Sequence, residues 1–194
     1  MIDVATAAGS VLAAFGLSGA AGLNAWIPLL AAGLLDRAGQ LQLPEPYDVL
    51  ATTPGLIVLG VLFALDFVGD KVPAIDSLLH AVGTVVHPAS GAIVFAGPTE
   101  TPTDIPSIVL FALGASVAGS LHATRATIRP ASTTLTAGAG NPVFSLGEDL
   151  SSAALSVLAV LAPLVGFLAL LVVAVTAVLW WRRVARARRR RGLR

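Results

Sequence analysis

Long uncharged hydrophobic segments alternate with short polar stretches along this chain. Residues 4–35, 105–124 and 150–181 contain no Asp, Glu, Lys or Arg, and two further apolar segments, 55–69 and 73–96, contain one Asp each. A helix needs about 20 mostly apolar residues to cross a bilayer. The pattern therefore predicts an all-α integral membrane protein with several spanning helices.

The segment lengths predict about six membrane segments, five full spans and one short or re-entrant. The first segment exceeds one untilted span and contains small residues at 16–22, which permit close helix packing or a break. The last segment is also over-long and contains Pro163, a predicted kink. Residues 132–147 form the weakest segment, which we expect either to cross as a fifth span or to re-enter the membrane.

Composition supports the membrane assignment and excludes some chemistry. The chain of 194 residues is 56% hydrophobic and 12% charged, whereas soluble domains are roughly 45–50% apolar and about 25% charged. Cysteine is absent, which excludes disulfides, thiolate metal sites and cysteine nucleophiles. The N-terminus MIDVATAAGS lacks a basic flank, so we expect its hydrophobic segment to remain in the mature protein.

Basic residues are concentrated at the C-terminus, where eight of the twelve lie in WWRRVARARRRRGLR. Two tryptophans followed by arginines are typical of an interfacial anchor with a cytoplasmic basic flank. We predict a single membrane domain over residues 1–181 and a basic cytoplasmic tail over 182–194. The tail is expected to contact anionic lipid headgroups rather than nucleic acid, through Arg182, Arg183, Arg186, Arg188, Arg189, Arg190 and Arg191.

Two parts of the chain resemble each other. Residues 14–25 (AFGLSGAAGLNA) align without gaps on 112–123 (ALGASVAGSLHA), with six of twelve positions identical. This predicts two inverted repeats of three segments each, over about residues 4–97 and 105–181. If the N-terminus is cytoplasmic, eleven of the twelve basic residues fall on the cytoplasmic side, and so does the C-terminus.

Polar residues follow one face of the helix predicted from Pro73. Asp76, His80, Thr84 and His87 are spaced by four, four and three residues, which places them on one helix face, and Asp70 and Lys71 precede the helix. Charged groups cost about 2.5–3.5 kcal/mol near a bilayer centre and normally face a bundle interior. The alternative is that the acids and Lys71 form an interfacial turn and helix cap, with histidines that only pack.

A second set of polar residues lies in the other half of the chain: His122, Arg125, Asn141, Glu148 and Asp149. Arginine near a helix end is suited to meeting an anion or pairing with a carboxylate; alternatively it marks a cytoplasmic helix end. No catalytic motif is present. Asp76, His80 and His87 are weak evidence for a metal site, so we predict no metal, no cofactor and no enzyme.

Four stretches carry a resemblance to a known family: GLNAWIPLLAAGLL, DKVPAIDSLLHAVGTVVHPASGA, HATRATIRP and NPVFSLGED. Together they cover most of residues 14–160. The chain resembles the bacterial membrane proteins grouped as domain of unknown function 4126. The resemblance implies a shared fold in the bacterial cytoplasmic (inner) membrane and shared polar positions, with no activity attached: Asp70, Lys71, Pro73, Asp76, His122, Arg125, Asn141, Pro142, Glu148 and Asp149.

These patterns predict a small transporter or channel for an ion or small anionic solute, with a polar site between the two repeats. Asp70, Asp76 and Glu148 would bind a cation or proton, and Arg125 would meet an anionic group. His80 and His87 predict proton coupling. A non-transporting scaffold that packs partner helices and binds lipid through the tail is the alternative, followed by a lipid-carrier flippase or a membrane enzyme. The small-residue faces are compatible with a homodimer.

Overall fold

The computed structural model describes residues 4–69, 73–99, 105–136 and 140–192. Within these ranges the backbone forms seven α-helices, one short 3-10 helix and no strand, which confirms the all-α prediction. The elements are α1 (Val4–Leu23), α2 (Trp26–Arg37), η1 (Tyr47–Ala51), α3 (Thr53–Gly69), α4 (Pro73–Thr99), α5 (Ser107–Thr136), α6 (Asn141–Leu161) and α7 (Pro163–Gly192).

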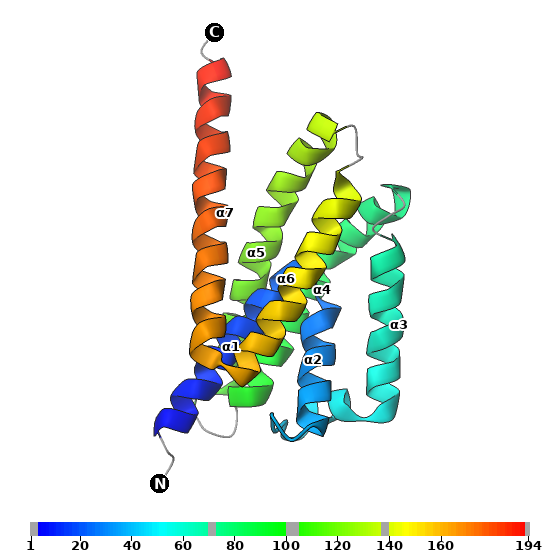
Figure 1. Cartoon of the computed structure of the whole chain (residues 1–194), viewed down its shortest axis with the longest axis vertical. Coiled ribbons are helices and arrows are strands. Elements are labelled where there is room, and N and C mark those ends of the chain that lie inside the picture. The colour runs from blue at the N-terminus through cyan, green and yellow to red at the C-terminus, as the bar shows by residue number, and fades with distance from the viewer. Residues whose placement is uncertain (1–3, 70–72, 100–104, 137–139, 193–194) are drawn as a thin grey trace.

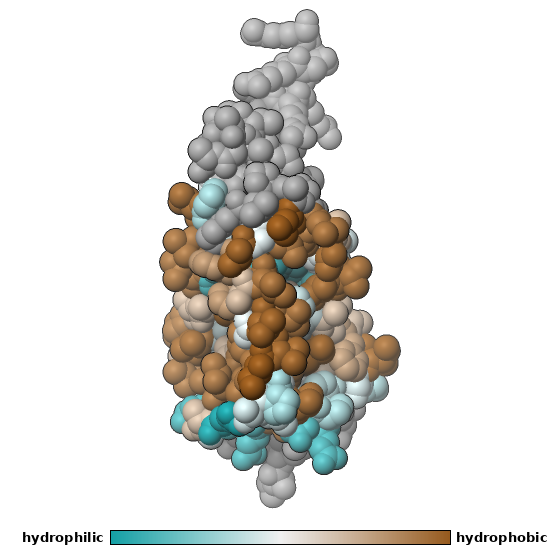
Figure 2. Space-filling view, turned by 90° about the vertical axis from the view of Figure 1, so that its right-hand side faces the viewer, coloured by the Kyte–Doolittle hydropathy of each residue, from teal (hydrophilic) through white to brown (hydrophobic). Residues whose placement is uncertain are grey.

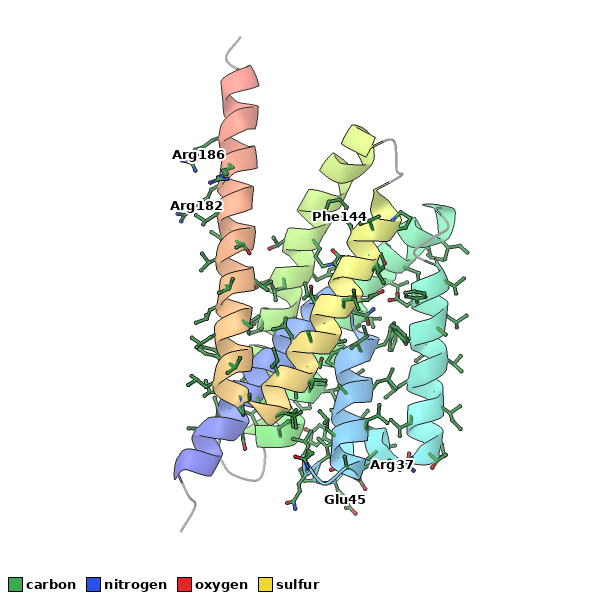
Figure 3. The ribbon with its side chains drawn as sticks, in the orientation of Figure 1. Arg37, Glu45, Phe144, Arg182 and Arg186 are labelled. Carbon is green, nitrogen blue, oxygen red and sulfur yellow. The ribbon has the colours of Figure 1, made fainter. Side chains whose placement is uncertain are left out.

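Helices α3 to α7 run alternately between the two ends of an elongated bundle (Figure 1). Helices α1 and α2 are arranged differently. The first enters from the lower end and stops inside the bundle, and the second returns to the lower end, where Arg37 lies (Figures 1 and 3). The first apolar segment of the sequence is thus a helical hairpin with its bend in the protein interior.

Three helices are long and apolar enough to cross a membrane, and they contain the stretches Ala81–Pro98, Ser107–Ala126 and Pro142–Leu161. Shorter apolar stretches occupy Ala7–Leu23, Thr53–Gly69 and Pro163–Thr176. Figure 2 shows that apolar side chains cover the outer face on the α3 side, with polar residues gathered towards the lower end. A broad exposed apolar face bordered by a polar end is expected of a membrane protein.

Helix α1 lies at the centre of the bundle and packs against α4, α5, α6 and α7. Its second half is built of small residues that are almost completely buried, including Ser18, Ala20 and Ala21. Small residues let helix backbones approach closely, as the sequence predicted for this run. Small residues also allow α4 and α5 to pack closely. Gly91 and Gly114 face each other, and a side chain on either would collide with the backbone of the other.

Several sequence predictions need correction. Residues 132–147 are not a separate segment: 132–136 end α5 and 141–147 begin α6. The hydropathy is weak in this window because it contains the end of one helix and the start of the next, with Gly and polar residues among them. The chain does not merely bend at Pro163, since α6 ends at Leu161 and a new helix starts at Pro163. The start of α1 and the end of α7 lie at opposite ends of the bundle (Figure 1).

Candidate functional site

The break between α1 and α2 lies deep in the protein, at Asn24 and Ala25. A helix end leaves backbone N–H and C=O groups without intrahelical partners, and these are costly to bury. Asn24 serves the new helix, because its side-chain oxygen accepts hydrogen bonds from the backbone N–H groups of Trp26 (2.9 Å) and Ile27 (3.1 Å). The side chain of Asn24 thereby caps the start of α2.

The carbonyl groups at the end of α1 are bound by side chains from three other helices. Ser152 of α6 donates to the Ala20 carbonyl at 2.9 Å. His87 of α4 lies 2.6 Å from the Ala21 carbonyl through Nδ1, and Arg125 of α5 donates to the Gly22 carbonyl at 3.4 Å. A cationic side chain at a helix C-terminus also interacts favourably with the helix dipole.

The contact to Ala21 defines the protonation of His87. A carbonyl oxygen only accepts hydrogen bonds, so Nδ1 must carry the proton. Nε2 is then free to accept from Arg125 Nη1, which lies 3.5 Å away. The neighbouring ring of His122 from α5 stacks on His87, with centroids 4.2 Å apart and an interplanar angle of 29°. His122 is buried, so this pair lies inside the bundle.

Arg125 and Glu148 form an ion pair between α5 and α6, with Arg125 Nη2 to Glu148 Oε2 at 2.5 Å. The side chains are 12% and 18% exposed, so the pair is shielded from solvent on most sides. A charge-assisted hydrogen bond in such surroundings is stronger than one at a surface. Arg125 therefore connects three things: the α1 end, the histidine pair and the Glu148 carboxylate.

Two further carboxylates meet at Asn24. Its side-chain nitrogen donates to Asp149 Oδ1 at 2.9 Å and to Asp66 Oδ2 at 3.2 Å. Asp149 is buried, with 8% of its surface exposed. The side-chain amide of Asn24 thus connects α3 and α6 to the break between α1 and α2 by hydrogen bonds. We call the whole group the break cluster; it comprises Asn24, Asp66, His87, His122, Arg125, Glu148 and Asp149.

A groove of about 420 Å³ adjoins the break cluster between α6 and α7. Among the described residues that line it, Glu148 is the one that carries a charge, and the others are apolar or small: Leu23, Val143, Phe144, Gly147, Ser151 and Val173. Phe144 lies near the upper end of α6 in Figure 3. The groove therefore leads from the outer surface to the Arg125–Glu148 pair.

Five of the predicted site residues belong to the break cluster: His87, His122, Arg125, Glu148 and Asp149. Of the two partners predicted for Arg125, the structure shows the carboxylate. Asp70 and Lys71 lie outside the described residues. Asp76, His80 and Asn141 belong to described helices, but their side chains lie outside the described part of the structure. Among the described residues no group of three His, Asp or Glu side chains is arranged to hold a metal ion.

The predicted site omitted Asn24 and Asp66. The two aligned segments, 14–25 and 112–123, differ in structure at this position. Helix α1 ends beside Asn24, whereas α5 continues past His122, the residue that aligns with Asn24. A signal for both was present in the sequence. Asn24 is a strongly polar residue after the small-residue run of an uncharged segment, and Asp66 is the one charged residue in 55–69. Polar groups in such positions are candidates by default.

Within the described residues, fold and site define an all-helical protein with three stretches long and apolar enough to cross a membrane, and a polar cluster at an interrupted helix. The chain belongs to the family described as Domain of unknown function (DUF4126), whose model matches residues 11–183. Neither the curated proteins nor the solved structures contain a match to the chain.

Proposed function

We propose that the protein is a small membrane transporter for a charged solute, with its site at the break between α1 and α2. The observation that carries the proposal is the convergence of seven polar side chains from α3, α4, α5, α6 and the α1–α2 bend on that break. Interrupted helices with polar groups at mid-depth are the usual binding sites of transporters.

The charge of the break cluster favours a cation over an anionic solute. Among its described side chains the break cluster has three carboxylates, Asp66, Glu148 and Asp149, and one guanidinium, that of Arg125. Its formal charge is therefore −2 when the carboxylates are ionised and both histidines are neutral. The C-terminal end of α1 adds a partial negative charge of about half a unit. A site of this kind stabilises a bound cation or proton.

The proposed membrane arrangement has five crossing helices, α3 to α7, with α1 and α2 as a re-entrant hairpin. The total remains five spans and one re-entrant segment, although the re-entrant one is at residues 4–37 instead of 132–147. Support for two repeats comes from Asn24 and His122, which the sequence alignment pairs and which both belong to the break cluster. The basic C-terminal end of α7 would face the cytoplasm, with the N-terminus opposite.

Flux through reconstituted protein tests the proposal. Liposomes containing the purified chain, with a potassium diffusion potential, are assayed for proton movement with an enclosed pH dye and for uptake of radioactive rubidium. We expect flux above that of empty liposomes, and a loss of about tenfold or more in Asn24→Ala and Arg125→Gln. Ser120→Ala is the control, because Ser120 is exposed and bonds only to its own helix. Flux of both ions that is equal in all four proteins would contradict the proposal.

A non-transporting scaffold is the second candidate, and one observation favours it. The carbonyls at the end of α1 already have protein donors, as an architectural network would require. Arg182, Arg183 and Arg186 are exposed on α7, and Figure 3 shows Arg182 and Arg186 directed away from the bundle. Each would contribute about 1 kcal/mol to binding of anionic lipid. A scaffold predicts that removing the tail abolishes function while Glu148→Gln is tolerated.

A further inference from the structure

The groove between α6 and α7 differs in chemistry from a pathway for a hydrated ion. Its walls are formed by Leu23, Val143, Phe144 and Val173, and its charged group is Glu148. Apolar walls with a few placed polar groups, in a volume of about 300–1,000 Å³, characterise sites for organic molecules. The observed volume of about 420 Å³ lies in this range. The lining therefore suits a solute with an apolar body and one charged group.

The sign of that charge follows from the inner end of the groove. Glu148 lines the groove itself, Asp149 lies behind it, and Leu23 is the last residue of α1, whose C-terminus carries partial negative charge. Arg125 is the one described cation that offsets these groups. A positively charged solute is therefore attracted to this end of the groove, and an anion of equal shape is repelled.

We propose that the groove binds a lipophilic monovalent organic cation, with its charge at the Glu148 carboxylate and its apolar groups against Val143, Phe144 and Val173. The inference rests on the proposed function, because it names the class of solute for the same site. Arg125 need not lose all its partners when the solute competes for Glu148, since the Gly22 carbonyl and His87 Nε2 remain within reach.

Two glycines allow a matched test of the groove. Gly147 lines it, and a Cβ added at Gly147 meets no atom within 4 Å. The same is true of Gly60 on α3, away from the groove. Gly147→Leu therefore places a side chain in the groove without a collision at its Cβ, and Gly60→Leu makes the same chemical change elsewhere. Both replacements favour a helix over glycine, so neither is expected to unfold the protein.

Binding is measured with radiolabelled tetraphenylphosphonium by equilibrium dialysis of the purified full chain in detergent. Tetraphenylborate, an anion of nearly the same shape, is the matched probe. We expect the cation to bind the unaltered protein and Gly60→Leu equally, and to bind Gly147→Leu and Glu148→Gln at least about tenfold more weakly, a loss of about 1.4 kcal/mol. The anion is expected to bind at least about tenfold more weakly than the cation.

The inference is overturned if the cation does not bind, if Gly147→Leu binds it as well as Gly60→Leu does, or if tetraphenylborate binds equally tightly. These results leave the proposed function standing when proton or rubidium flux still depends on Arg125. Conversely, groove-specific cation binding without flux of any tested ion supports the binding site and contradicts transport. The detergent assay requires no membrane crossing, so the two failures are distinguishable.

Discussion

Replacing Asn24 by alanine removes two kinds of hydrogen bond from a side chain that is 97% buried, with 3% of its surface exposed. The oxygen loses the N–H groups of Trp26 and Ile27 at the start of α2. The nitrogen no longer donates to Asp149 and Asp66. The substitution therefore removes both the side-chain cap of α2 and a hydrogen bond that stabilises a buried carboxylate.

The expected cost follows from these two losses. A helix cap contributes about 0.5–2 kcal/mol, and a hydrogen bond to a charged group contributes about 1.5–3 kcal/mol. Asp66 is less buried than Asp149 and its bond is longer, so we assign it little. Asn24→Ala is thus expected to lower the free energy of unfolding by about 2–5 kcal/mol.

Asn24→Asp separates the two contributions because it keeps the capping oxygens and removes the donor. It also places a third carboxylate beside two others, and like charges about 4 Å apart repel by several kcal/mol even at an effective dielectric constant of about 20. We therefore expect Asn24→Asp to be less stable than Asn24→Ala at neutral pH, although it preserves the cap.

Equilibrium unfolding in mixed micelles, followed by tryptophan fluorescence, measures this order of stabilities. Trp26 lies two residues from the substitution and reports on the bend directly. The reasoning is refuted if Asn24→Ala unfolds within about 0.5 kcal/mol of the unaltered protein, the range of ordinary surface substitutions. It is also refuted if Asn24→Asp is as stable as the unaltered protein, because the amide donor would then contribute nothing.

Three further predictions test other parts of the structure in the same unfolding assay. Ser152→Ala removes a buried donor to an α1 carbonyl and should lower the free energy of unfolding by about 1–3 kcal/mol. The control Ser151→Ala alters the neighbouring, exposed serine and should change it by less than about 0.5 kcal/mol. Equal effects of the two substitutions would contradict the assigned burial. Arg125→Ala and Glu148→Ala should each lower the free energy of unfolding by about 2–4 kcal/mol, which is below the value for a fully buried pair because both groups are partly exposed. The double substitution should cost less than the sum of the two single ones. Additive costs would argue against the ion pair. Gly114→Leu should cost at least about 1–3 kcal/mol, because it forces α5 away from the α4 backbone, and an unchanged stability would exclude the close crossing.

Parts of the site were predictable because polar residues in apolar segments are few. His122, Arg125, Glu148 and Asp149 lie in or beside segments of high hydropathy, and such groups must face one another or a cavity. Their partners were not predictable. Arg125 and Glu148 are 23 residues apart, and Asn24 and Asp149 are 125 apart, so no local spacing relates them. The pairing depends on which helix faces meet.

The error at 132–147 has a physical cause. Hydropathy predicts a membrane segment from the apolar content of a window, but the end of a helix that projects beyond the apolar region has no need of apolar residues. A hydropathy window therefore merges the polar end of α5 and the start of α6 into one weak segment, although α5 ends at Thr136 and α6 begins at Asn141. Pro73 was a more reliable marker, since α4 begins there as the sequence predicted.

The sequence by itself determined the helical class, the apolar segments, the helix start at Pro73 and the close packing of α1, because these follow from local apolar content, proline geometry and side-chain size. Only the tertiary structure decided that the break between α1 and α2 is buried. The local sequence favours a break there, because Asn24 caps α2 and Pro28 has no N–H for the carbonyl of residue 24. The interrupted backbone is stabilised inside the protein by His87, Arg125 and Ser152 from three other helices. Buried carbonyl groups need donors, and the tertiary structure supplies those donors at the end of α1.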